Sequence, residues 1–205
     1  MKRNVKGHIS PSVNFAVKHL EGTKDQAYAV EQVRRQLEER FSLKEVGSTA
    51  KRTRTRTSAH DIDFIVIFPK NKAGSAPKVL RDELHRRCLK LLPKLREIVK
   101  GSIIHVHLHS RTVKLEVQCQ GKCVVFDMMP ALKGENGEYQ VPNENKEWKS
   151  QAKHIEISLL EEEAIKRAVL LGKVVKDSYF PSLLPSCAFE FAINEMKAEP
   201  KFNPV

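Results

Sequence analysis

Three aspartates lie inside the most apolar segments of this sequence, where a carboxylate is costly to bury without a partner. Asp61 and Asp63 open the run Asp61–Phe68, which is short, β-branched and aromatic and is therefore predicted to be a buried strand. Side chains alternate along a strand, so both carboxylates leave from the same face. Asp127 lies within a second such run, 123–129. It is interpreted as a salt-bridged core residue, as a residue at a strand end, or as a third carboxylate that meets the first two across neighbouring strands.

Carboxylates that share one face repel each other unless a cation lies between them. Mg²⁺, or the similar Mn²⁺, is the expected ion because it is hard and prefers one or two carboxylates together with the phosphates of a substrate. Three carboxylates would make a two-metal site, in which the ions hold a triphosphate and activate an attacking hydroxyl group. We therefore predict metal-dependent phosphoryl chemistry at Asp61, Asp63 and Asp127.

A Gly-Ser pair and a basic stretch precede the first aspartate. Gly47 would let the backbone approach a phosphate closely, and the Ser48 hydroxyl would donate a hydrogen bond to it. The stretch after them alternates threonines with four cations, Lys51, Arg52, Arg54 and Arg56. These cations are interpreted either as part of a solvated loop or as a loop that gathers the phosphates of a triphosphate or a nucleic acid.

The order of these motifs resembles that of the polymerase-β-type nucleotidyltransferases. The stretch 46–53 followed by 61–66 is similar to the Gly-Ser and Asp-x-Asp signature of that superfamily. Archaeal CCA-adding enzymes carry similar stretches. The oligoadenylate synthase and cyclic GMP–AMP synthase-like group, also called the CD-NTases, fits better further along the chain. There the resemblance rests on 126–131, on 139–143, and on Trp148, Lys173 and Ser186.

This resemblance implies that the three aspartates bind the metal ions and that the Gly-Ser pair cradles the β- and γ-phosphates. It also implies that Lys173 and Ser186 contact the triphosphate. The expected reaction is template-independent transfer of a nucleoside monophosphate to a hydroxyl of a nucleotide, with release of pyrophosphate. The product would be an oligonucleotide or a cyclic nucleotide, of the kind used in antiviral defence. Two alternatives stay open: a nucleotidyltransferase acting on RNA 3′ ends, and a catalytically weak module that binds nucleotides or RNA.

The order of predicted elements indicates an α+β fold. We expect 1–150 to form a nucleotidyltransferase palm, a mixed sheet with helices on one side, and 151–205 to form a short helical appendage that packs against the sheet. A long helix from Pro77 should be kinked or broken at Pro93, and 133–154 should be a loop. The other predicted elements are helices over 23–41, 158–176 and 186–196 and strands over 44–46, 61–68, 101–111, 112–118 and 123–129. Thr23 followed three residues later by Gln26 predicts a capping box at the start of the first of these helices.

The composition favours a polyanionic partner. Of 205 residues, 36 are Lys or Arg and 25 are Asp or Glu, and the net charge of +11 indicates nucleoside triphosphates, RNA or another polyanion. No apolar run approaches the ~18 residues of a membrane helix, so we expect no membrane association and a cytoplasmic location. The four cysteines are expected to be free thiols. Because the helical part is short, we also expect a second copy or another protein to cover the cleft.

Overall fold

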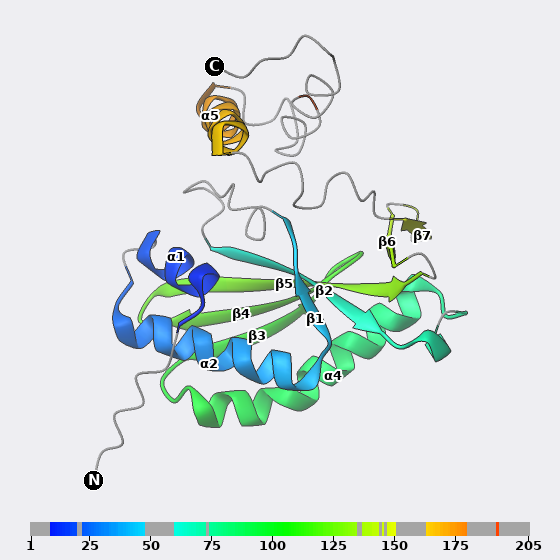
Figure 1. Ribbon diagram of the computed structural model, residues 1–205. Helices are drawn as coiled ribbons and strands as arrows, with labels where there is room; N and C mark the ends of the chain where they lie inside the picture. The colour runs from blue at the N-terminus through cyan, green and yellow to red at the C-terminus, as the bar shows by residue number, and fades with distance from the viewer. Residues whose placement is uncertain are drawn as a thin grey trace.

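The computed structural model describes residues 9–19, 22–47, 60–72, 74–134, 137–143, 145, 147–150, 163–179 and 192. Their strands form one seven-stranded sheet (Figure 1). Five strands lie side by side in the order β1 (Leu43–Glu45), β2 (Asp61–Phe68), β5 (Lys122–Lys133), β4 (Val113–Cys119) and β3 (Ile103–Leu108). β6 (Tyr139–Pro142) pairs with the end of β5, and β7 (Trp148–Ser150) pairs with β6. β2 and β5 run parallel and the other pairs antiparallel, so the sheet is mixed.

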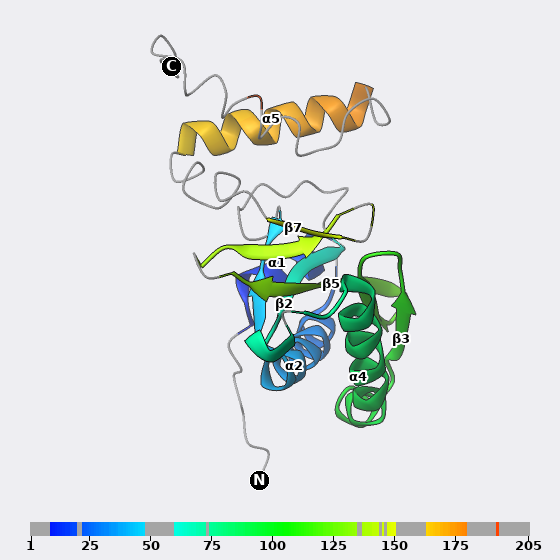
Figure 2. The same ribbon diagram turned by 90° about the vertical axis from the view of Figure 1, so that its right-hand side faces the viewer.

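Helices cover one face of this sheet. α2 (Lys24–Arg40) and α4 (Pro77–Ile98) lie side by side against it, and α1 (Pro11–His19) packs on α2 and β2. A short 3₁₀ turn, η2 (Lys70–Lys72), follows β2. α5 (Glu163–Tyr179) lies on the opposite side of the sheet from α2 and α4 (Figure 2). The predicted fold class, α+β with a mixed sheet and helices on one side of it, is confirmed.

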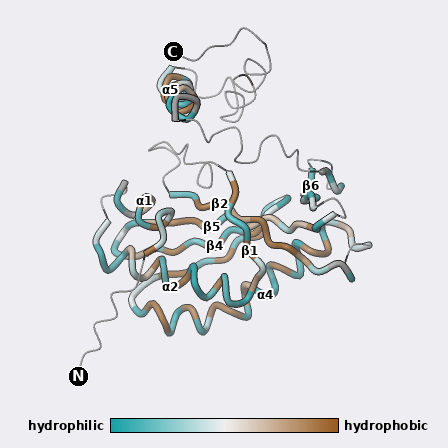
Figure 3. Tube along the Cα trace, in the orientation of Figure 1, coloured by the Kyte–Doolittle hydropathy of each residue, from teal (hydrophilic) through white to brown (hydrophobic). Residues whose placement is uncertain are grey.

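The two faces of the sheet differ in polarity because side chains alternate along each strand. Ile62 and Phe64 of β2 and Phe126 and Met128 of β5 face α2 and α4 and are almost completely buried. The rings of Phe64 and Phe126 stack with their centroids 6.2 Å apart. Figure 3 shows the resulting apolar colour along the central strands. Packing of these residues holds β2 beside β5. The other face of the same two strands carries the aspartates together with apolar residues such as Ile65 and Val125, which are buried as well.

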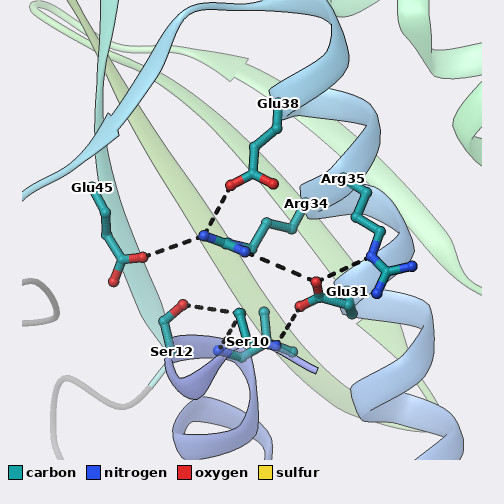
Figure 4. Close-up of polar contacts among 8 residues, drawn as sticks. Ser10, Ser12, Glu31, Arg34, Arg35, Glu38 and Glu45 are labelled. Atoms are coloured by element: carbon teal, nitrogen blue, oxygen red, sulfur yellow. Dashed lines mark hydrogen bonds and ion pairs between the residues drawn. The ribbon is translucent and has the colours of Figure 1, made fainter. Parts of the chain in front are cut away.

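Ion pairs fasten α1, α2 and β1 to one another (Figure 4). The buried carboxylate of Glu31 accepts a hydrogen bond from the Ser10 N–H at 3.0 Å and lies 3.9 Å from Arg34 Nη1. Arg34 Nη2 lies 2.9 Å from Glu38 Oε1 and 3.7 Å from Glu45 Oε2. Since Glu45 ends β1, this network holds the strand that leads directly into Gly47.

Several helix predictions are confirmed, and one of the two outcomes expected at Pro93, a break in the helix, does not occur. Thr23 and Gln26 form the predicted capping box at the start of α2: the Thr23 N–H donates to Gln26 Oε1 at 2.6 Å, and the Gln26 N–H donates to Thr23 Oγ1 at 3.3 Å. α4, in contrast, continues through Pro93 without a break. Pro93 removes the donor for the Leu89 carbonyl, but both residues are exposed, so water can replace that donor. α1 was not predicted.

Two strand predictions need correction. The segment 133–154, predicted to be a loop, contains β6 and β7. β5 does not end at Pro130 but continues to Lys133. The Val125 N–H donates to the His60 carbonyl on the β2 side, and N–H groups alternate along a strand, so the Pro130 nitrogen faces the β4 side. β4 stops pairing at Met128, so the proline removes no hydrogen bond there.

The C-terminal part is described only in α5. The predicted helix start at 158, the predicted last helix (except residue 192) and Ser186 lie outside the described residues. α5 stands apart from the sheet and does not pack on it as α2 and α4 do, contrary to expectation (Figure 2). Val169 and Lys173, one turn apart on α5, are nevertheless buried. Among the described helices, none contains a stretch long and apolar enough to cross a membrane.

Candidate active site on the open face of the sheet

The register of β2 and β5 brings the predicted carboxylates together. Asp63 pairs with Asp127 and Asp61 pairs with Val125 in the parallel ladder, so all three carboxylates lie on the face away from α2 and α4. Neighbouring strands are about 4.8 Å apart, whereas residues two apart on one strand are separated by roughly 6.6 Å. Asp63 and Asp127 are therefore adjacent across the ladder, and Asp61 lies one pleat further along β2. This arrangement is the one expected if Asp127 meets the Asp-x-Asp pair across strands.

A lysine and a histidine lie beside these carboxylates. Lys114 on β4 is the ladder partner of Asp127, and its Nζ lies 3.4 Å from Asp127 Oδ2. His60 Nε2 lies 3.4 Å from Asp61 Oδ2 at the start of β2. The ion pair with Lys114 is the one expected of a salt-bridged Asp127. Neither residue was singled out from the sequence. Lys114 is one of several polar residues alternating along its strand, and only the register assigns it to Asp127.

One carboxylate oxygen of the site has an unmet hydrogen-bonding capacity. Asp127 Oδ1 is buried and has no hydrogen-bond partner among the described residues. Leaving a buried carboxylate oxygen unpaired is unfavourable by roughly 1–3 kcal/mol or more. An orphan of this kind, next to a second carboxylate, indicates a place where a further positive group would be stabilised.

Gly47 lies directly against the carboxylate of Asp63. The Val46 N–H donates to the Asp63 carbonyl at 2.9 Å, which holds the chain next to β2 just before the glycine. Gly47 has a φ of +67°, a conformation that residues with a Cβ rarely adopt. A Cβ at this position would overlap Asp63 Oδ2 and lie 3.1 Å from Asp63 Cγ. Glycine is therefore required here both by backbone conformation and by the close approach to a carboxylate.

These donors fit Mg²⁺ or Mn²⁺ in chemistry but are not arranged as a closed metal cage. Within the described residues, no three His, Cys, Asp or Glu side chains converge as a metal-binding group. The reason is visible in the ion pairs, since Asp127 turns one oxygen to Lys114 and Asp61 turns one to His60. The hard oxygen donors and the unpaired Asp127 Oδ1 still match the preference of these ions for a few carboxylates plus substrate phosphates.

The remaining predicted site residues are only partly placed. Lys173 is buried on α5, the helix on the open side of the sheet. Ser48, the basic loop and Ser186 lie outside the described residues, so their roles stay predictions. The basic loop comprises Lys51, Arg52, Arg54 and Arg56.

Further polar side chains lie on the same face of the sheet, on β3 and β4. His105 and His107 of β3 share it with Glu116 of β4, and His107 Nε2 lies 3.4 Å from Glu116 Oε2. Cys123 is also on this face, and burial, Glu116 and Asp61 all raise the pKa of its thiol. Cys119, across the hairpin, projects to the helix-covered face, so the two cysteines do not converge on a common metal, in line with the expected free thiols.

Comparison with known proteins shows the fold but no near relative. No family model matches the sequence, and no curated protein does. The structure of CdnC from E. coli MS115-1 with ATP is similar, with a TM-score of 0.56 at 16% identity over 91% of this chain and 64% of that one. The CdnC:HORMA-deltaN complex gives a TM-score of 0.57 at 16% identity, over 92% of this chain and 60% of that one.

A third similar structure is the CD-NTase CdnG of Bradyrhizobium diazoefficiens in complex with GTP. Its TM-score is 0.51 at 14% identity, over 93% of this chain and 72% of that one. This chain thus spans less than two thirds of the length of the CdnC chains. At such low identities the likeness concerns the fold, and on that evidence the chain has the nucleotidyltransferase palm fold of the CD-NTases.

Proposed function

We propose that this protein is a metal-dependent nucleotidyltransferase that transfers a nucleoside monophosphate from a triphosphate to a hydroxyl of a nucleotide. The observation that carries the proposal is the register of β2 and β5, which places Asp63 beside Asp127 with Asp61 on the same face. The palm fold shared with CdnC and CdnG supports it, and those structures hold ATP and GTP respectively. An oligonucleotide or cyclic nucleotide is the product we propose.

The three aspartates would hold Mg²⁺ or Mn²⁺, which when bound neutralises the triphosphate and polarises the phosphoryl group under attack. The chain's own groups then orient the reactants. The Gly47 backbone lies against Asp63, where any other side chain would intrude on the carboxylate, and it would cradle a phosphate there. Ser48 and Lys173 would donate to the β- and γ-phosphates.

Asp127 Oδ1 is buried and has no partner among the described residues, so it would serve either as a ligand of the bound ion or as the acceptor of the proton of the attacking hydroxyl. In the second role Asp127 acts as the general base. As that proton moves to Asp127, the hydroxyl oxygen bonds to the α-phosphorus. The bond from the α-phosphorus to the bridging oxygen breaks, and pyrophosphate leaves with the electron pair. The other Asp127 oxygen stays with Lys114, which keeps the carboxylate oriented.

Charge favours a second candidate, an enzyme that extends RNA 3′ ends. A net charge of +11 suits an acceptor that is a polyanion better than one that is a single nucleotide. A protein partner is also proposed, since CdnC has been seen in a complex with HORMA-deltaN.

Analysis of products after incubation with the four labelled triphosphates, with and without RNA, separates these candidates. Short or cyclic products without RNA support the first proposal, and label only on RNA supports the second. We expect Asp63→Asn and Asp127→Asn to abolish both, and Mg²⁺ to raise the melting temperature of the wild type but not of these variants. Asp25→Asn, an exposed carboxylate on α2, is the control. Full activity in both site variants would refute the assignment.

A further inference from the structure

A basic pocket lies on the other side of the molecule from the carboxylates. It has a volume of about 330 Å³ and is lined by Arg40, Phe41, Arg87, Lys90, Leu91 and Lys94, from the end of α2 and the middle of α4. Both helices cover the face of the sheet that the aspartates do not share. Arg87 lies over the ring of Phe68, which is five residues beyond Asp63 and so about 16 Å further along β2. The pocket is therefore separate from the candidate active site.

Arg87 is fixed before any ligand arrives. Its guanidinium lies 4.7 Å from the centroid of the Phe41 ring and 6.0 Å from that of Phe68. Its Nη2 donates a hydrogen bond to the Arg40 carbonyl at 2.9 Å, at the C-terminal end of α2. This contact alone would explain Arg87 as a cap of that helix. It does not explain the other cations around the same pocket.

The other cations follow Arg87 on one face of α4. Lys90 and Lys94 lie three and seven residues after it, which puts all three in a row about 10 Å long, and Arg40 joins them from α2. In the part of the chain that the structure describes, no carboxylate lies within ion-pair distance of Arg40, Arg87 or Lys90. Lys94 has one carboxylate neighbour, Glu39 at 3.9 Å, and both side chains are largely exposed, so this pair contributes little.

Four cations around one concavity repel one another unless an anion joins them. Phe41 and Leu91 are each only 6% exposed, so the pocket offers no aromatic ring on which a base could stack. A phosphoryl group has oxygens in several directions and up to two charges, which suits cations that approach from two helices. We propose that this pocket is a second, phosphate-binding site, which takes the phosphoryl groups of a free polyphosphate or nucleotide or those of a nucleic-acid strand.

The test measures binding of two probes in EDTA, inorganic tripolyphosphate by calorimetry and a 20-nucleotide single-stranded DNA by fluorescence anisotropy. The double variant Lys90→Gln/Lys94→Gln removes two pocket cations without touching the Arg87 cap. Lys78→Gln/Lys100→Gln removes the same charge from exposed positions, one in the first turn of α4 and one just beyond its last residue, and is the matched control. Asp63→Asn tests independence from the carboxylate site.

We expect the pocket variant to lose at least tenfold in affinity for one of the probes, and the control and Asp63→Asn to change less than twofold. Loss with tripolyphosphate assigns the site to free phosphates. Loss with DNA alone, together with a salt slope lower by about 1.4 for two lost contacts, assigns it to a strand. Equal losses in the pocket variant and the control would overturn the proposal. Absence of binding by the wild type would overturn it too. The same holds if poly-L-glutamate binds as tightly as the phosphate probes and loses as much affinity in the pocket variant.

Discussion

Replacing Gly47 with alanine tests whether the chain before β2 has to lie against Asp63. Gly47 has a φ of +67°, where a Cβ destabilises the backbone by about 1–2 kcal/mol. The same change lowers the conformational entropy of the unfolded chain, which stabilises the folded state by about 0.4–1 kcal/mol. The net destabilisation is therefore about 1 kcal/mol. For a protein of this size that lowers the melting temperature by about 2–4 °C.

A second effect is specific to this glycine. The new Cβ would overlap Asp63 Oδ2 and lie 3.3 Å from Asp63 Cβ, so the carboxylate has to move. Mg²⁺ tolerates little departure from octahedral geometry, and displacing a ligand should weaken its binding by about 10- to 100-fold. We therefore expect Gly47→Ala to lose most of its stabilisation by Mg²⁺ and its nucleotidyl transfer, while it remains folded.

Gly101→Ala provides the matched control. Gly101 has a φ of +83°, but a Cβ there would meet no atom within 4 Å. Both variants should melt a few degrees below the wild type in EDTA, and only Gly47→Ala should respond weakly when Mg²⁺ is titrated. Equal Mg²⁺ responses in the two variants would show that Asp63 is not a metal ligand or that the glycine does not constrain it.

Three further outcomes are expected. Lys114→Met removes the ammonium group beside Asp127 and should lower the free energy of unfolding in EDTA by about 1 kcal/mol. It should also raise the affinity for Mg²⁺, because the metal no longer competes with the ammonium for Asp127. Unchanged Mg²⁺ affinity by calorimetry would contradict this. Burial, opposed by Arg87, raises the pKa of the Cys88 thiol to about 12. The free energy of unfolding that this shift contributes is complete below pH 9 and falls by about 1.4 kcal/mol per pH unit above pH 9. Denaturant titrations at several pH values should show this slope in the wild type and not in Cys88→Ala. Replacing Arg52, Arg54 and Arg56 of the basic loop together with alanine should flatten the salt dependence of polyanion binding. An unchanged slope would show that the loop only faces water.

The sequence by itself determined the features that depend on a few neighbouring residues. Alternation along β2 put Asp61 and Asp63 on one face whatever the rest of the chain did. The capping box at Thr23 depends on groups three residues apart, and it formed as predicted. Local patterns failed at Pro130, and the helix break that was one alternative at Pro93 did not form. A proline's missing N–H disrupts an element only where a carbonyl would otherwise accept a hydrogen bond from it.

Tertiary structure decided which distant residues meet. Asp63 and Asp127 are adjacent because packing of Phe64 against Phe126, and of their neighbours against α2 and α4, sets the register of two strands far apart in the chain. A shift of one residue in that register would turn Asp127 to the apolar face. The pairing of Lys114 with Asp127 follows from the next ladder in the same way. The register cannot be read from either strand alone, because it is set by the pairing that buries all the apolar side chains of one face of the sheet.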